Sequence, residues 1–314
     1  MMFPSSRVHS RYDHGLLVHE CDEQLVQGTR SFVERGLVSG AHVLVHGTRH
    51  RVALLREVLG THPRLEYGFD EELYQAPMRT LFAYQQKLAE IPDGTEFWVT
   101  GTVPQGRDAA EQAAWARYES AVNEALSTFP FRALCTYDAE ALPRSVVAGA
   151  LATHPRISTD LTTGASPKYV DPAAFLDDPL AQTPRPPSWP PTMSATITHL
   201  EHLARVRHLI STSARASSAV SQQAIGELLT AVNEVAANGL FHGAPPVQVS
   251  LWADIGKLTC LVVDSGPGIS DPMSGYRYPD ESSPMGLWAT RQLVDDTFIS
   301  NLPGGGCNVL LTKT

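Results

Sequence analysis

The stretch from Leu228 to Gly268 decides the fold of the second half of the chain. It contains Glu234-Val-Ala-Ala-Asn238 and, after an expected hairpin of strands, Asp264-Ser-Gly-Pro-Gly268. Residues four apart lie on one face of an α-helix, so Glu234 and Asn238 point the same way, away from the apolar stripe of that helix. Asp264 ends an apolar strand and leads into a flexible turn. A carboxylate, an amide and a glycine-rich turn together predict a site for a nucleotide and a hard cation.

The segments around this stretch predict an α+β arrangement, in which antiparallel hairpins carry helices on one side. The expected helices cover residues 199–213, 219–239 and 286–295, and the expected strands cover residues 247–252, 258–263, 298–300 and 308–312. Gly286 opens its helix, whose free N–H groups suit a phosphate chain. Residues 270–285 form the expected lid. We expect its Tyr276-Arg277-Tyr278 to lie in a mobile surface loop, with contact to a nucleotide or a partner as the alternative.

The first half of the chain alternates short apolar strands with helices. The expected strands are residues 41–45, 96–100 and 132–137, and the expected helices are residues 22–35, 51–59, 77–91, 109–126 and 144–152, the first capped by Asp22 and stopped by Gly36. This alternation predicts a three-layer α/β domain with a parallel sheet covered on both faces. Such sheets bind ligands beyond the carboxyl ends of their strands, which points to residues 47–48 and 100–102.

A proline-rich segment separates the two halves. It has prolines at 172, 179, 184, 186, 187, 190 and 191. Prolines oppose both helix and sheet, so we expect a semi-rigid linker, with a proline motif read by a partner as the alternative. The expected division is residues 1–165 for the first domain, 166–194 for the linker and 195–314 for the second domain.

Composition and charge restrict the class of protein. The chain has 314 residues, of which 43% are hydrophobic and 18% charged, as expected for two globular domains. A net charge of -9 without a basic stripe argues against direct binding of nucleic acid. The chain has no apolar run of membrane-spanning length and no signal-peptide core, so we expect a cytoplasmic protein without a membrane segment.

The cysteines and histidines give no metal-binding pattern in sequence. The four cysteines are scattered: Cys21, Cys135, Cys260 and Cys307. They indicate buried thiols in a reducing compartment. His14 and His19 lie close to Cys21, but their spacing matches no common zinc motif, which favours packing or surface roles.

Five short runs characterise the first half: His14-Gly-Leu-Leu-Val-His-Glu20, Gly36-Leu-Val-Ser-Gly40, Thr100-Gly101, Leu134-Cys-Thr-Tyr-Asp138 and Thr153-His-Pro155. Together they resemble the MEDS sensory domain of regulators of one-carbon and chlorinated-hydrocarbon metabolism, over residues 12–157. The resemblance implies a domain that senses a small molecule, and no binding residue carries over. A purely structural α/β interaction domain is the alternative.

Three motifs occur in register in the second half: Glu234-Val-Ala-Ala-Asn238-Gly-Leu-Phe-His242-Gly243, Asp264-Ser-Gly266-Pro-Gly268, and Gly286-Leu287 followed by Leu-Val-Asp295. In order and spacing they resemble the GHKL (histidine-kinase-like) ATPase superfamily, over residues 197–314. More narrowly, the domain resembles the anti-sigma-factor serine kinases of bacteria, in which the Asn helix ends in His-Gly. The resemblance implies a two-layer α+β sandwich that binds ATP and Mg²⁺.

The resemblance also implies a role for each motif residue. Glu234 would be the catalytic base, Asn238 the Mg²⁺ ligand, and Asp264 the acceptor for the adenine amino group. The implied cofactor-binding set is Asn238, His242, Asp264, Gly266, Gly268, Gly286 and Leu287. The structural alternatives are a solvated helix carboxylate, a helix-ending amide and a turn aspartate.

Four positions depart from the family pattern. Pro284 and Met285 stand where relatives have glycine and often arginine, and Cys307 stands where many have threonine. Gly239 replaces a commoner alanine and is expected to shorten the site helix. None of the four removes the implied base, metal ligand or adenine acceptor, so nucleotide binding is expected while phosphotransfer remains open.

The leading hypothesis is an anti-sigma factor with serine/threonine kinase activity toward an anti-anti-sigma (STAS-type) protein. ATP would support binding to a sigma factor, and phosphate transfer would change the binding partner. A small-molecule ligand of the first domain would shift the balance between these partners. Family analogy implies a homodimer through residues 199–213. One alternative is an ATP-dependent protein-binding switch without transfer. The other is a sensor histidine kinase, for which the residues before Ala219 provide one helix rather than a dimerisation hairpin.

Overall fold

The computed structural model describes residues 12–92, 94–158, 163–178, 184–217, 219–279 and 285–314. By its contacts the chain divides into two compact units, Met1–Gln75 with Thr80–Phe175, and Ala76–Arg79 with Leu176–Thr314. Each unit contains its own sheet and its own apolar core.

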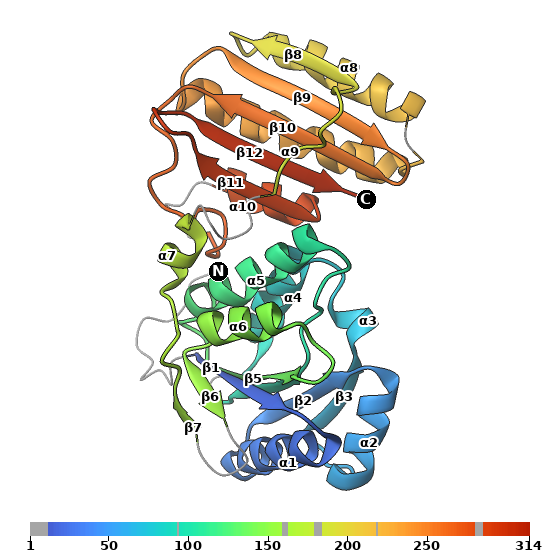
Figure 1. The fold of residues 1–314 in the computed structure, drawn as a ribbon, viewed down its shortest axis with the longest axis vertical. Helices are drawn as coiled ribbons and strands as arrows, with labels where there is room; N and C mark the ends of the chain where they lie inside the picture. Colours follow the sequence, from blue (N-terminus) through green and yellow to red (C-terminus); the bar gives the residue numbers. More distant parts are fainter. Residues whose placement is uncertain (1–11, 93, 159–162, 179–183, 218, 280–284) are drawn as a thin grey trace. The chain divides into compact units, whose positions relative to one another are not determined.

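The first unit is built on a seven-stranded sheet of order β3-β2-β4-β5-β1-β6-β7, parallel except for β7. The strands are β1 (Asp13–His19), β2 (His42–Gly47), β3 (Leu65–Phe69), β4 (Phe97–Gly101), β5 (Phe131–Asp138), β6 (Arg156–Ser158) and β7 (Thr163–Ala165). The helices are α1 (Asp22–Ser39), α2 (Arg49–Leu59), α3 (Asp70–Leu73), α4 (Pro77–Glu90), α5 (Ala109–Ala125) and α6 (Arg144–Thr153). In Figure 1, α1 and α2 cover one face of the sheet and α4, α5 and α6 cover the other. The predicted three-layer α/β architecture is confirmed.

Helix α1 is longer than the sequence predicted, because Gly36 does not stop it. A Cβ at Gly36 would lie 3.0 Å from Cε3 of Trp98, so this glycine lets the helix pack closely on the sheet. The helix ends instead at Gly40, whose φ of 90° is the left-handed conformation of a C-cap. The predicted cap was also wrong: Cys21 is the N-cap residue, and Asp22 lies in the first turn, where its charge favours the helix dipole.

Parts of the expected linker are regular structure, which corrects the prediction that its prolines exclude helix and sheet. Helix α7 (Pro172–Asp177) has a proline at its first position, where the missing N–H is not needed. The Asp171 carboxylate caps it by accepting from the N–H of Ala173 at 3.0 Å. Strand β8 (Met193–Ile197) pairs with β9 and so belongs to the second sheet. Pro179 lies outside the described residues.

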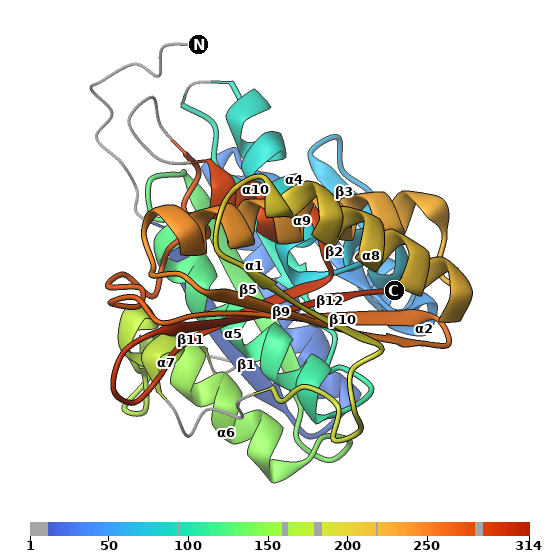
Figure 2. The same ribbon diagram turned by 90° about the horizontal axis from the view of Figure 1, so that it is seen from above.

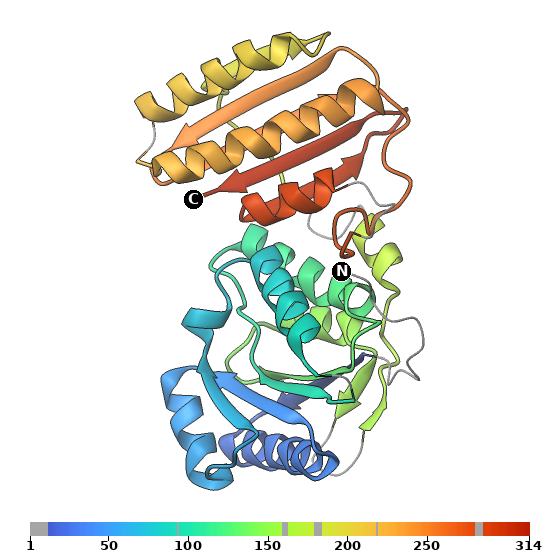
Figure 3. The same ribbon diagram turned by 180° about the vertical axis from the view of Figure 1, so that it is seen from behind.

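The second unit is an antiparallel sheet of order β11-β12-β10-β9-β8. The other strands are β9 (Val247–Asp254), β10 (Lys257–Asp264), β11 (Asp296–Asn301) and β12 (Cys307–Lys313). The helices are α8 (His202–Ser217), α9 (Gln222–Phe241) and α10 (Gly286–Leu293). Figure 2 views this sheet edge-on with the three helices on one side, and Figure 3 shows the helices in front of the strands. The predicted two-layer α+β sandwich is confirmed.

Alternation along β10 places the site at one end of the core. Leu258, Cys260 and Val262 face the helices and are at most 3% exposed. Asp264 follows two residues later, so it continues the same helix-facing row beyond the last buried residue. Leu228, Val232 and Val235 form the buried stripe of α9 that the sequence predicted.

Candidate functional site

A cavity of about 550 Å³ opens between α9, α10 and the end of β10. Its lining includes seven of the eight predicted site residues: Glu234, Asn238, His242, Asp264, Gly268, Gly286 and Leu287. A volume of this size is typical of pockets for small molecules and cofactors. The structure therefore brings together residues that lie up to 53 positions apart in the sequence.

Helix α9 carries the first two site residues toward the cavity. Ser221 caps it, because its side chain accepts from the N–H of Ala224 at 3.1 Å. Glu234 and Asn238 are half-buried and line the same cavity, as their spacing predicted. The helix runs through Gly239 to Phe241, so the expectation of a shortened helix was wrong.

Glycines allow close packing around Asp264. The Oδ1 of Asp264 accepts from the N–H of Gly266 at 2.8 Å, which orients the carboxylate. Gly266 does not line the cavity; a Cβ there would collide with the backbone of Gly243. A Cβ at Gly243 would in turn lie 2.5 Å from Oδ1 of Asp264. These two glycines let the segment after α9 lie directly against the turn after β10.

The turn after β10 is fixed by a residue that the sequence analysis did not identify. Asn301, at the end of β11, accepts from the N–H of Ile269 at 2.8 Å and donates to its carbonyl at 2.9 Å. The neighbouring Gly268 has a φ of 84°, which favours glycine. No local sequence signal connects these positions, since the contact depends on the pairing of strands.

Helix α10 presents its first turn to the cavity. Gly286, Leu287 and Trp288 all line it. A Cβ at Gly286 would collide with the carboxylate of Glu234, so the two helices meet at this point. Within the described residues no side chain caps α10, which is a property of helix N-termini that bind anions. Met285 precedes the helix and is exposed, and Pro284 lies outside the described residues.

The start of the expected lid is packed rather than loose, which corrects the prediction of a mobile surface loop for Tyr276. Met273 is fully buried and Tyr276 is 4% exposed. Arg291 of α10 holds this segment at Ser274 and Tyr276. Its guanidinium lies 3.9 Å from the Tyr276 ring centroid and donates to the carbonyls of Ser274 and Thr297. Arg277 and Tyr278, in contrast, are exposed and line the cavity.

Cys307 contributes an apolar wall. It lies opposite Asp264 in the β10–β12 ladder and also lines the cavity. Burial, with a further contribution from the Asp264 charge, raises the pKa of its thiol to about 12. The thiol is therefore neutral at physiological pH.

Side chains from three segments meet at the expected ligand positions of the first unit. Arg51 donates to Thr102 at 2.8 Å and to Asp138 at 3.1 Å, across the carboxyl ends of three strands. A cavity of about 1030 Å³ lies at the opposite edge, among residues that include Asp13, Glu96 and Arg132. The structure thus shows open space at the amino ends of the strands, and the predicted ligand positions at their carboxyl ends stay a prediction.

Two family models match the chain. Residues 13–155 match the family described as MEDS, the methanogen/methylotroph DcmR sensory domain, and residues 197–313 match the histidine kinase-like ATPase domain. No curated protein sequence matches the chain.

Among solved structures, the chain is similar to the histidine kinase domain of the Escherichia coli osmosensor EnvZ. That match has 18% identity and a TM-score of 0.24, and it covers 40% of this chain and 90% of the other. None of the helices in the described part of the chain is both long enough and apolar enough to cross a membrane. From the two family matches, the chain is a MEDS sensory domain followed by a histidine kinase-like ATPase domain of the GHKL superfamily.

Proposed function

We propose that this ATP-binding regulator is an anti-sigma factor with serine/threonine kinase activity, whose MEDS domain adjusts that activity in response to a small molecule. The observation that carries the proposal is the single cavity that brings Glu234, Asn238 and Asp264 together. The phosphate acceptor would be a serine of an anti-anti-sigma protein of the STAS type. Phosphorylation of that serine would change which partner the sigma factor meets.

The donor atoms around the cavity suit ATP with Mg²⁺. Asn238 offers an amide oxygen and Glu234 a carboxylate, and Mg²⁺ prefers oxygen ligands. Mg²⁺ would supply neutralisation of the phosphate charge. Asp264 would accept from the adenine amino group, and the uncapped first turn of α10 would donate to the phosphates.

Transfer would need one proton acceptor near the attacking hydroxyl. The Glu234 carboxylate would accept the proton of the serine hydroxyl while the serine oxygen forms a bond to the γ-phosphorus. ADP would leave with the β–γ bridging oxygen. The carboxylate lies against Gly286, at the end of α10 where the phosphates would sit. Position rather than covalent chemistry is what this reaction requires from the protein.

The experiment begins with nucleotide binding, measured as the thermal shift produced by ATP and Mg²⁺. Asp264→Asn keeps the shape of the side chain but removes its charge, and a hydrogen bond to a charged group contributes about 2 kcal/mol, or roughly 30-fold in Kd. The matched control is Asp254→Asn, at the exposed far end of β9. We expect the shift to persist in the control and to fall in Asp264→Asn. Equal thermal shifts in both variants would contradict the assignment of Asp264 as the acceptor for the adenine amino group.

The second arm of the experiment follows labelled phosphate from ATP to a STAS-type partner. Label on the partner that disappears in Glu234→Gln, while ATP binding persists, supports the kinase. Nucleotide-dependent binding of the partner without label supports the alternative, a switch without transfer. Acid-labile label on the chain itself would indicate a histidine kinase.

One observation counts against that last alternative. Within the second unit, α8 is the helix that precedes α9, and its apolar side, Leu203, Val206 and Ile210, is buried in its own domain. It is therefore part of the ATPase sandwich and not a separate dimerisation hairpin. A homodimer through α8 would have to use its polar side.

A further inference from the structure

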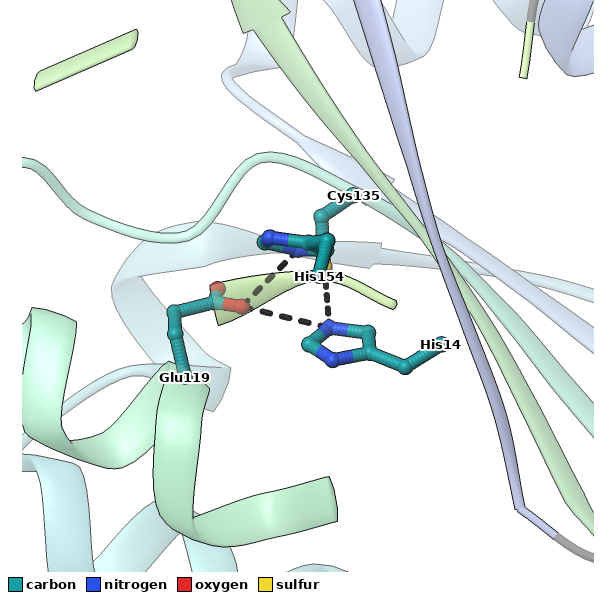
Figure 4. Close-up of side chains that lie close together, drawn as sticks. All are labelled: His14, Glu119, Cys135 and His154. Atoms are coloured by element: carbon teal, nitrogen blue, oxygen red, sulfur yellow. Dashed lines mark hydrogen bonds and ion pairs between the residues drawn. The ribbon is translucent and has the colours of Figure 1, made fainter. Parts of the chain in front are cut away.

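Four chemically reactive side chains meet inside the first unit, although they are far apart in sequence. His14 comes from β1, Glu119 from α5 and Cys135 from β5, and His154 follows the last residue of α6. One ligand atom from each lies within 4.8 Å of all the others. Each residue is at most 8% exposed. Figure 4 shows both imidazoles, the carboxylate and the thiol pointing toward one another.

This cluster is different from the one that the sequence suggested. His14 and His19 are five positions apart on β1, so they point to opposite faces of the sheet. Cys21 is exposed at the start of α1. The partners of His14 come instead from elements more than 100 residues away.

Hydrogen bonds on the outer side of each imidazole fix which nitrogen faces the centre. The amide N of Asn123 donates to three backbone carbonyls, so its Oδ1 must be an acceptor, and it lies 3.1 Å from Nδ1 of His14. His14 therefore carries its proton on Nδ1. His154 likewise donates from Nδ1 to the carbonyl of Ala150 at 2.8 Å. Both rings, when neutral, direct the lone pair of Nε2 inward, which is the arrangement of histidines that bind metals.

Among the inward atoms, Nε2 of His14 has a hydrogen-bond partner in Sγ of Cys135 at 3.3 Å, whereas the other close contacts lack hydrogen-bond geometry. Oε2 of Glu119 lies 3.0 Å from Nε2 of His154 and 3.2 Å from Nε2 of His14. Yet among the described residues neither oxygen of Glu119 nor Nε2 of His154 has a partner with hydrogen-bond geometry. A buried anion without hydrogen bonds is costly unless a cation lies beside it.

We propose that His14, Glu119, Cys135 and His154 bind one Zn²⁺, or a similar divalent transition-metal ion, in a closed site. Tetrahedral zinc with bonds of about 2.0–2.3 Å separates its ligand atoms by about 3.3–3.7 Å. The separations of 3.0 to 3.3 Å around Nε2 of His14 and Oε2 of Glu119 would widen slightly, and the wider separations, which reach up to 4.8 Å, would close by about 1 Å. The mixed N, O and S set excludes Mg²⁺ and Ca²⁺, which prefer oxygen alone.

The charges balance at this site. Zinc binding displaces the proton of the Cys135 thiol to solvent, so one thiolate and one carboxylate neutralise the two positive charges. The adjoining cavity, lined by His14, Glu119 and Cys135, has a volume of about 20 Å³. That is room for about one water molecule, which fits a structural ion and not a substrate-binding centre. The ion would join two strands of the sheet to the two helices that cover it.

The alternative is that the cluster holds no metal and is stabilised by protons shared between its side chains. In it, the Cys135 thiol donates to Nε2 of His14, 3.3 Å away, and a protonated His154 pairs with Glu119. The two readings predict different metal contents, and neither depends on nucleotide binding in the second domain.

The test uses the untagged full chain. We expect elemental analysis to find about one zinc per chain, and refolding with Co²⁺ in place of zinc to give the visible absorption of a tetrahedral ion together with a thiolate charge-transfer band. Cys135→Ser should abolish that band, and His154→Gln should lower the metal content several-fold. His46→Gln is the matched control, a buried histidine of the same sheet that pairs with Asp70 instead.

Two results would overturn the proposal. One is a folded wild-type chain that contains no metal and gives no tetrahedral Co²⁺ spectrum, which would establish the proton-filled reading. The other is metal retained equally by Cys135→Ser, His154→Gln and the control. If the variants fail to fold by circular dichroism, the wild-type stoichiometry and spectrum still decide between the two readings.

Discussion

Glycine residues set how closely the segments around the ATPase cavity approach one another. At Gly243, Gly266 and Gly286 an added Cβ would meet a carboxylate or a backbone atom at 2.5 Å or less. At Gly226, in the exposed part of α9, it would meet nothing within 4 Å. The same residue type therefore has opposite effects on stability at these positions.

We expect Gly266→Ala to lower the free energy of unfolding by about 2 kcal/mol, because the methyl group forces two backbone segments apart. Gly226→Ala should raise it by about 1 kcal/mol, since alanine favours the helix. Urea unfolding of the two variants beside the wild type measures both. Loss of stability in Gly226→Ala would show that α9 is not helical at that point.

The site residues that the sequence predicted are those with short-range patterns. Glu234 and Asn238 are one helical turn apart, and Asp264 ends an apolar run, so each is visible locally. Asn301 and Gly243 act on segments that only strand pairing and helix packing bring to them. The cluster of His14, Glu119, Cys135 and His154 is still harder to predict, because its members lie on or directly after four separate elements and share no sequence spacing.

Arg291 shows how one helix holds a loop in place. It is 3% exposed, and it ties the segment 273–276 to α10 and β11 through two carbonyls and one aromatic ring. A guanidinium can make these contacts together because its donors are planar and its face stacks on rings.

We expect Arg291→Met to lower the free energy of unfolding by about 3 kcal/mol, since it leaves two carbonyls without their charged donor. It should also make the chain after Arg277 more open to trypsin in limited proteolysis. The matched control is Arg205→Met, on the exposed side of α8, which should leave both readouts unchanged. An identical digestion pattern for Arg291→Met would contradict the anchoring role.

At the level of elements, the sequence predicted the long periodic helices and the apolar strands. It did not identify β1, β3 or β6, because these strands are short or contain histidine, glycine and arginine. The predicted end of α1 was wrong because glycine often ends a helix, whereas Gly36 lies inside the helix and allows it to pack closely against the sheet. Tertiary contacts, which no local window contains, decide such cases.

The accessibility of thiols tests the packing of both units at once. Cys21 is exposed, whereas Cys135, Cys260 and Cys307 are buried. Burial raises the pKa of Cys260 to about 12. Because the thiolate is the reactive form, raising the pKa lowers reactivity at pH 8.

We expect iodoacetamide at pH 8 to modify Cys21 alone in the folded chain, and all four cysteines after denaturation. Mass spectrometry of tryptic peptides identifies the modified positions, and Cys21→Ser should remove the native signal. Modification of Cys307 in the folded chain would show that the wall beside Asp264 opens.

Strand β8 has a practical consequence for work on the ATPase domain alone. It lies at the edge of the sheet, and the segment before it is fastened to β9 where Trp252 donates to the carbonyl of Trp189 and Ala253 donates to Thr192. A fragment that begins at residue 195 would lack the first part of this strand, and backbone N–H and C=O groups of β9 would be left without partners. Another copy of the fragment could then pair with them. Fragments that begin before Trp189 would keep β8 paired with β9, whereas shorter fragments would be prone to aggregate.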